Sequence, residues 1–259
     1  MPNGSSRVYV FRGNPQGPLN TLLRNWQLVM GVLIFLFIVN IVMSGTGSLL
    51  DKIINFLLFI PVLLISLPFH ELAHGWMANF LGDPTARLMG RLSLNPMRHL
   101  DFVGTIMLFT TGFGWAKPVP IDPANFKDPE RAAVSVSLVG PLANIILAFA
   151  GGAIIKALTF FPALIHPTDL FSAIPFEFAK LLIGVNLALA AFNLIPIPPL
   201  DGSRIVAVLL PRRYRAQYRG LEELDPLLII IVLMLGLHSG FMRAFTIKGI
   251  ELITMAFNL

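Results

Sequence analysis

Long apolar runs alternate with shorter polar segments along most of this chain. A stretch of about 17–25 apolar residues is long enough to cross a bilayer as a helix. Five runs approach or exceed that length, and the last is the shortest: Trp26–Met43, Ile53–Leu81, Ala132–Ile155, Leu181–Leu200 and Leu227–Met242. The pattern predicts an all-α polytopic membrane protein with about five to six transmembrane helices.

One further apolar segment, Asp101–Trp115, is short and rich in glycine, which is not typical of a spanning helix. It leads into Gly114–Pro123, where each residue before a proline is pushed towards extended geometry. Non-helical backbone is tolerated at membrane depth only where protein or water covers it. We therefore predict a small membrane re-entrant β element around Gly114–Pro123. The alternative, that residues 101–115 span the membrane, stays open at this point.

Composition supports a membrane protein. Hydrophobic residues make up 55% of the 259 residues, charged residues only 13%, and the mean hydropathy is +0.75, whereas soluble domains are about 25% charged. The net charge of +5 comes from basic residues between the apolar runs, which favours the lipid bilayer, and not nucleic acid, as a partner. The chain has no cysteine, so disulfides and thiolate metal sites are excluded.

Positive charge predicts the orientation of the runs. Lys and Arg are frequent in Met1–Arg24, Gly82–Arg131 and Ser203–Asp225, whereas Ser44–Lys52 has one such residue and Thr159–Ile174 has none. Loops enriched in Lys and Arg stay on the cytoplasmic side of a membrane. The three basic segments are therefore expected in the cytoplasm.

The second apolar run carries the motif His70–His74, which has the sequence His-Glu-Leu-Ala-His. Histidines four residues apart project from one face of a helix and can bind one Zn²⁺, with Glu71 beside them as a candidate general base. Ionisable groups inside a membrane indicate function, because they are costly when unpaired. The alternative is a pair of hydrogen-bonded structural histidines in a helical bundle. A further histidine, His99, lies in a basic segment and is expected at the surface.

A catalytic zinc usually has three protein ligands, and Asp201 is the best-placed acidic residue for the third. At 1.5 Å per helical residue, His70 and His74 lie about 26 and 32 Å from Ile53, and Asp201 lies about 30 Å from Leu181. The two apolar runs would therefore deliver the three side chains to a similar depth. The alternative for Asp201 is a helix N-cap near the membrane surface.

Two motifs, His70–Gly75 and Asn193–Gly202, together resemble those of the site-2 protease family of intramembrane zinc metalloproteases. The resemblance also includes Gly140–Asn144 and the Gly-Trp-Ala-Lys-Pro-Val-Pro segment at Gly114–Pro120. It extends from about Ile53 to Asp225 and is closest to the minimal branch of the family, which has neither a PDZ nor a CBS domain.

The resemblance implies a role for each matched residue. His70, His74 and Asp201 would bind Zn²⁺, and Glu71 would be the catalytic carboxylate. Asn193 matches a residue that holds substrate or the reacting carbonyl, whereas Asn144 is either part of the active-site rim or an interhelical hydrogen-bonding residue. The expected substrate-binding residues are Asn193, Asn144, Trp115 and Lys117.

The resulting expectation is an intramembrane zinc endopeptidase that cuts single-span membrane proteins within or near their transmembrane segments, in regulated intramembrane proteolysis. It would be integral to a prokaryotic cell membrane, with its active site near the cytoplasmic side. A membrane metal-binding or transport protein is the alternative, although transport favours ionisable residues spread through several spans. The expected divisions are a cytoplasmic tail (1–25), a first transmembrane helix with an outer loop (26–52), the catalytic membrane core (53–225) and a C-terminal transmembrane helix with a tail (226–259).

Overall fold

The computed structural model describes residues 48–102, 104–106, 116–165, 170–219 and 240–259. They fall in two compact units. The larger consists of Gly47–Asp101 and Ala116–Leu259, and the smaller of Met1–Thr46 and Phe102–Trp115. In the smaller unit the described residues, 102 and 104–106, are helical. The predicted first span and nearly all of the fifth lie outside the described residues.

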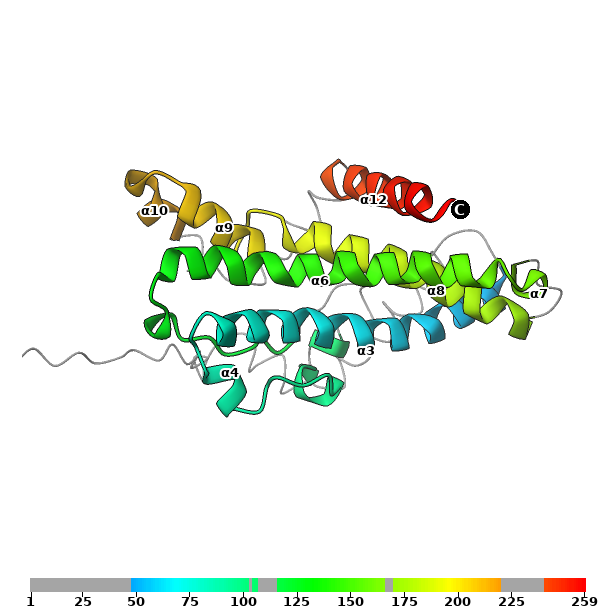
Figure 1. Ribbon diagram of the computed structural model, residues 1–259, viewed down its shortest axis with the longest axis horizontal. Helices are drawn as coiled ribbons and strands as arrows, with labels where there is room; N and C mark the ends of the chain where they lie inside the picture. Colours follow the sequence, from blue (N-terminus) through cyan, green and yellow to red (C-terminus); the bar gives the residue numbers. More distant parts are fainter. Residues whose placement is uncertain (1–47, 103, 107–115, 166–169, 220–239) are drawn as a thin grey trace, which may run out of the picture. The chain divides into compact units, whose positions relative to one another are not determined.

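The larger unit is helical (Figure 1). Its helices are α3 (Leu49–Phe80), α4 (Thr85–Leu88), α6 (Pro129–Leu158), α7 (Pro162–Ile165), α8 (Leu170–Asn193), α9 (Asp201–Leu209), α10 (Arg212–Arg219) and α12 (Phe241–Phe257), with short 3₁₀ turns at Pro96–Arg98 and Pro123–Asn125. Within the described residues, three helices are long and apolar enough to cross a membrane: α3, α6 and α8. The protein is therefore an integral membrane protein with a mostly helical fold.

Helix α3 begins where the sequence provides a strong start signal. Ser48 accepts a hydrogen bond from the backbone N–H of Asp51, and the Asp51 carboxylate accepts one from the backbone N–H of Ser48. This reciprocal arrangement is a capping box. The helix runs for 32 residues and includes Pro61 and Pro68. It ends before Gly82, whose φ of +111° is readily adopted by glycine.

The predicted bounds are close for α3 and α6 but wrong for α8. The sequence pattern placed that run at Leu181–Leu200, whereas the helix spans Leu170–Asn193. The shift at its end has a physical reason, because the prolines at 196, 198 and 199 cannot continue a helix. Apolar character continues past the helix end, so hydropathy alone does not show the break. Asp201 consequently begins a new helix, α9.

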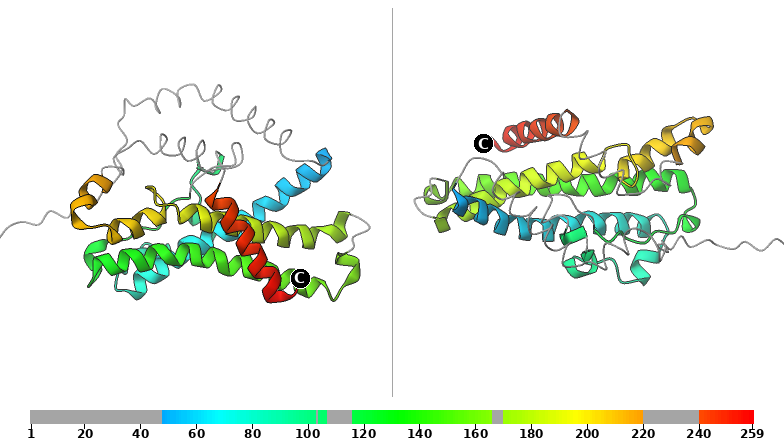
Figure 2. Two further views of the ribbon diagram at one scale, coloured as in Figure 1. Left: turned by 90° about the horizontal axis from the view of Figure 1, so that it is seen from above. Right: turned by 180° about the vertical axis from the view of Figure 1, so that it is seen from behind.

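Helix α6 packs against both α3 and α8, and α12 packs against α8 and α6 (Figures 1 and 2). One core cluster joins α6, α8 and α12: Ala148, Ile183, Leu187 and Ile253 are its buried members. The apolar pattern predicts that the residues after Met242 form a tail. Instead, α12 extends from Phe241 to Phe257 and contributes to this core.

The polar loop after α3 is organised by Asp83, which is fully buried. Its carboxylate accepts hydrogen bonds from the backbone N–H and hydroxyl of Thr85, the backbone N–H of Asp122 and the Asn125 amide. Burial acts to raise the pKa of the Asp83 carboxyl, but these hydrogen bonds outweigh it and hold the pKa below its ordinary value. The result is a fixed connection between the end of α3 and the segment that precedes α6.

The prediction that His99 lies at the surface is wrong, since His99 is fully buried. Its Nε2 lies 2.6 Å from the carbonyl oxygen of Ser93, and its own carbonyl accepts a hydrogen bond from the backbone N–H of Lys117. Leu100 and Ala116 form an isolated antiparallel bridge. The described residues contain no sheet, and residues 107–115 lie outside them, so the re-entrant β element stays a prediction.

Candidate active site

Helix α3 places His70 and His74 one turn apart with their rings in edge contact, 4.6 Å between centroids. Their Nε2 atoms are 2.9 Å apart. Oδ2 of Asp201, at the start of α9, lies 3.3 Å from Nε2 of His70 and 3.2 Å from Nε2 of His74. All three residues are buried. Three electron-pair donors from two separate helices therefore converge on one point.

The turns between α8 and α9 bring Asp201 to the histidines. Gly202 allows this approach because the start of α9 packs directly on the backbone that follows α8. A Cβ on Gly202 would lie 2.5 Å from the carbonyl carbon of Leu194 and 2.6 Å from the carbonyl oxygen of Ile195. A larger residue at Gly202 would therefore push Asp201 away from the histidines.

The contacts of the two Nδ1 atoms indicate where each histidine ring carries a proton. Nδ1 of His70 lies 2.6 Å from Oδ1 of Asn144, and Nδ1 of His74 lies 2.7 Å from the carbonyl oxygen of Val136. Both partners are acceptors, so each Nδ1 carries a proton. A neutral imidazole with its proton on Nδ1 has its lone pair on Nε2, which on both rings faces Asp201, and this is the tautomer that binds a metal through Nε2.

This arrangement fits a zinc ion. Oδ2 of Asp201 is buried, and its neighbours are the two Nε2 atoms at 3.3 and 3.2 Å. Three facing lone pairs are unfavourable unless a cation lies between them. Zinc–donor distances of about 2.0–2.2 Å with tetrahedral angles place neighbouring donors roughly 3.3 Å apart, close to the observed separations. The donor set also leaves a fourth position open.

Gly140 on α6 lies directly beside the rings of His70 and His74. A Cβ at Gly140 would overlap Nε2 of His74 and would lie 2.6 Å from Cε1 of His70. Because glycine has no side chain, the space next to Nε2 of His74 and Cε1 of His70 stays open. Glycine is required here for close approach.

Glu71 lies next to His70 on α3 and is partly buried. Its Oε2 accepts a hydrogen bond of 3.0 Å from the backbone N–H of Val119. The same segment is also held by Arg91, whose Nη2 donates to the carbonyl oxygens of Lys117 and Pro118 at 2.7 and 3.1 Å. One carboxylate oxygen of Glu71 is therefore fixed by the backbone.

The remaining predicted site residues lie in different places. Asn144 is fully buried and contacts His70. Asn193 ends α8, and its amide donates to the carbonyl oxygen of Leu189. The Lys117 side chain is exposed, and Trp115 lies outside the described residues.

Sequence reasoning missed two polar residues behind the site, Ser66 and Asn186. Both are fully buried. Their position as polar residues inside apolar runs is a sequence signal that could have identified them. Sequence reasoning also missed the backbone contacts of Val119 and Val136, which have no sequence signal because every residue offers the same backbone groups.

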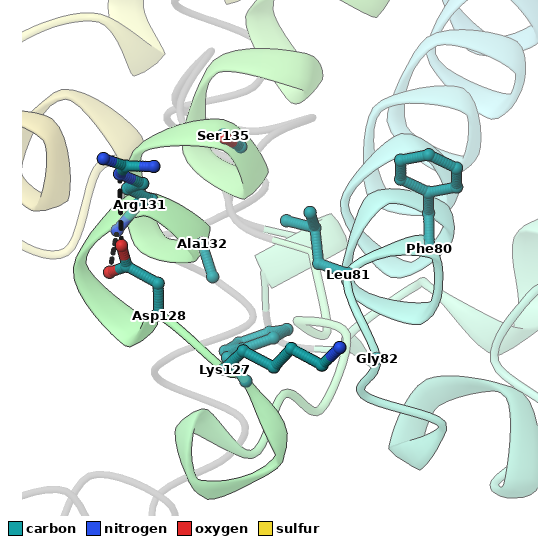
Figure 3. Close-up of a pocket in the computed structure, with 9 residues that line it drawn as sticks. Phe80, Leu81, Gly82, Lys127, Asp128, Arg131, Ala132 and Ser135 are labelled. Carbon is teal, nitrogen blue, oxygen red and sulfur yellow. Dashed lines mark hydrogen bonds and ion pairs between the residues drawn. The ribbon is translucent and has the colours of Figure 1, made fainter.

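A cavity of about 430 Å³ lies between the end of α3 and the first turns of α6 (Figure 3). Its lining includes Leu81 from one side and Ser135 from the other. Ser135 directly precedes Val136, whose carbonyl holds His74. Asp128 and Arg131 form an ion pair at the edge of the cavity, with Nε of Arg131 3.1 Å from Oδ2 of Asp128.

The sequence is similar to proteins of one known family. The family model described as Peptidase family M50 matches residues 162–235. The chain is 41% identical over 182 residues to a protein of Bacillus subtilis (strain 168) named "Putative zinc metalloprotease YwhC", covering 68% of this chain and 80% of that relative. No solved structure shows a significant match. The chain therefore belongs to peptidase family M50, the site-2 protease family, and is a zinc metalloendopeptidase.

Proposed function

We propose that this zinc endopeptidase hydrolyses peptide bonds within or near the transmembrane segments of single-span membrane proteins, as in regulated intramembrane proteolysis. One observation carries the proposal: His70, His74 and Asp201 converge on one point, and both histidines belong to a helix long and apolar enough to cross a membrane. A protease site built on such a helix suits substrates that lie in the same bilayer. Soluble substrates would have to reach a buried donor cluster from outside the membrane.

In this proposal His70, His74 and Asp201 hold the zinc, and Glu71 is the general base. Zinc bound in such a site supplies a Lewis acid that polarises the peptide carbonyl and acidifies water. Glu71 accepts a proton from the attacking water at Oε1 and delivers it to the leaving amine. The hydrogen bond from Val119 to Oε2 orients the carboxylate for this transfer. Asn193 is proposed to donate a hydrogen bond to the reacting carbonyl oxygen.

A transmembrane substrate arrives as a helix, so it must unwind locally before its carbonyl is exposed. One way to hold the unwound segment is to add it as a strand along the predicted re-entrant element at Gly114–Pro123, but the described part of that segment has few available donors. The N–H groups of Lys117 and Val119 are bonded within the protein, and Pro118 and Pro120 have none. Strand addition along these four residues therefore requires the two hydrogen bonds to break.

The proposed orientation places the site near the cytoplasmic side of a prokaryotic cell membrane. His70 and His74 lie in the last third of α3, whose end leads to the basic residues Arg87, Arg91 and Arg98. Basic loops favour the cytoplasmic side. The bacterial origin of the relative supports the choice of membrane.

The test is cleavage in liposomes that contain the purified chain and a single-span peptide with a helix-weakening glycine or asparagine in its span. We expect zinc-dependent cleavage, mapped by mass spectrometry to the half of the span nearest the basic loops. Replacing the weak residue with leucine should slow cleavage, because unwinding then costs more.

Two results would contradict the proposal. One is cutting of soluble peptides only, with the membrane-embedded peptide left intact. The other is the absence of any cleavage together with zinc movement across the liposome membrane, which would support the metal-transport alternative.

A further inference from the structure

A network of buried polar side chains connects His70 to three helices that are long and apolar enough to cross a membrane, α3, α6 and α8. Nδ1 of His70 on α3 contacts Oδ1 of Asn144 on α6 at 2.6 Å. Nδ2 of Asn144 donates to Oδ1 of Asn186 on α8 at 2.8 Å. Nδ2 of Asn186 donates to Oγ of Ser66, back on α3, at 2.9 Å. Asn144, Asn186 and Ser66 are all fully buried, so bulk water does not reach them.

Backbone carbonyl groups that contact Asn186 and Ser66 determine the direction of every hydrogen bond in this network. Nδ2 of Asn186 also donates to the carbonyl oxygen of Leu182, at 2.8 Å, and a carbonyl oxygen can only accept. The amide nitrogen of Asn186 must therefore face Leu182, which leaves its oxygen facing Asn144. The hydroxyl of Ser66 likewise donates to the carbonyl oxygen of Val62 at 2.7 Å, so its oxygen is free to accept from Asn186.

The same logic extends to His70. Because Oδ1 of Asn186 accepts, Asn144 must present its amide nitrogen to Asn186 and its oxygen to His70. An amide oxygen accepts, so Nδ1 of His70 carries the proton and Nε2 keeps its lone pair. If the Asn144 amide were reversed, it would donate to Nδ1 instead. The proton would then sit on Nε2, where it blocks metal binding.

We propose that Asn186 is a positioning residue of the zinc site: through Asn144 it fixes the His70 proton on Nδ1 and keeps Nε2 free for the metal. This inference rests on the proposed assignment of His70 as a zinc ligand. The buried setting makes the control effective, because an unpaired amide group in this environment costs about 1–3 kcal/mol. Without Asn186, either orientation of Asn144 leaves one amide group unpaired, so the preference is lost.

The test measures zinc affinity of the purified chain by competition with a chelating dye, together with helix content and the visible spectrum of the Co²⁺-substituted protein. Asn186→Leu is expected to weaken zinc binding by about 10-fold or more, in the range seen when outer partners of metal ligands are removed. Ser66→Ala is the matched control. It removes one acceptor but leaves Leu182 to orient Asn186, so zinc affinity should change by less than about 3-fold.

A second substitution separates positioning from packing. A carboxylate has no donor, so Asn144→Asp can only accept from His70 and sets the tautomer without help from Asn186. The double variant Asn144→Asp/Asn186→Leu should regain zinc affinity and a wild-type Co²⁺ spectrum relative to Asn186→Leu alone. Asn186→Ala replaces Asn186→Leu in the same comparison if the leucine variant does not fold.

The outcomes distinguish this inference from the proposed site. Wild-type zinc affinity in Asn186→Leu, or a loss that Asn144→Asp does not restore, overturns the positioning role while leaving the site intact. Wild-type zinc affinity in His70→Ala overturns the site assignment itself, and the inference with it.

Discussion

Glu71→Gln is expected to lower the rate of peptide hydrolysis by about 10²–10⁴-fold, the usual contribution of a general base. Glutamine keeps the length of the side chain, and its amide oxygen can still accept the hydrogen bond from Val119 that holds Oε2 of Glu71 in place. Zinc content and helix content should therefore stay at the wild-type level. The amide cannot take up a proton from water, so the defect should appear in kcat. Cleavage of a membrane-embedded peptide and metal analysis of the same preparation measure both quantities.

The matched control for this prediction is Glu177→Gln on α8. Glu177 forms a local ion pair with Lys180, with Oε1 2.7 Å from Nζ, and local pairs of this kind contribute only about 0.2–0.5 kcal/mol. Cleavage should be unchanged in this variant. A Glu71→Gln enzyme that cuts at the wild-type rate would show that a different group accepts the proton.

Gly140→Ala is expected to weaken zinc binding by about 5- to 150-fold, which corresponds to the roughly 1–3 kcal/mol cost of overpacking a well-filled site. The added methyl group would overlap Nε2 of His74 and lie 2.6 Å from Cε1 of His70. Either the rings turn away or the methyl group occupies the place of the metal. Proteolysis should be lost in parallel, and dye competition measures the affinity directly.

Gly184→Ala on α8 is the control for this change. A Cβ at Gly184 meets no atom within 4 Å, and alanine is the better helix former. Zinc affinity and thermal stability should be equal to or above those of the wild type. If Gly140→Ala binds zinc as tightly as Gly184→Ala, the metal does not lie against this face of α6.

Much of the site could be predicted from sequence because it depends on local chemistry. The spacing of His70 and His74 fixes their common helix face, and Asp201, the carboxylate directly after the fourth apolar run, is a natural third ligand. The structure brings Asp201 to the two histidines. The depth of Asp201 could be predicted only roughly, because the prolines at 196, 198 and 199 break the helix: α8 ends at Asn193 and a new helix carries the carboxylate.

Other features depend on tertiary contacts that no pattern reports. His99 is buried, and it contacts the carbonyl oxygen of Ser93 and the backbone N–H of Lys117, which a hydropathy pattern does not indicate. The orientation of Asn144 depends on Asn186, 42 residues away on another helix. Sequence shows that both are polar residues in apolar runs, but only the fold shows that they pair with each other and with His70.

The zinc K-edge X-ray absorption spectrum of the purified chain tests the central claim most directly. We predict one zinc per chain with two imidazole nitrogens and a carboxylate oxygen at about 2.0–2.2 Å, and loss of that shell in Asp201→Ala. A wild-type spectrum with fewer than two imidazoles, or an Asp201→Ala spectrum that is identical to wild type, would contradict the assignment of His70, His74 and Asp201 as the zinc ligands.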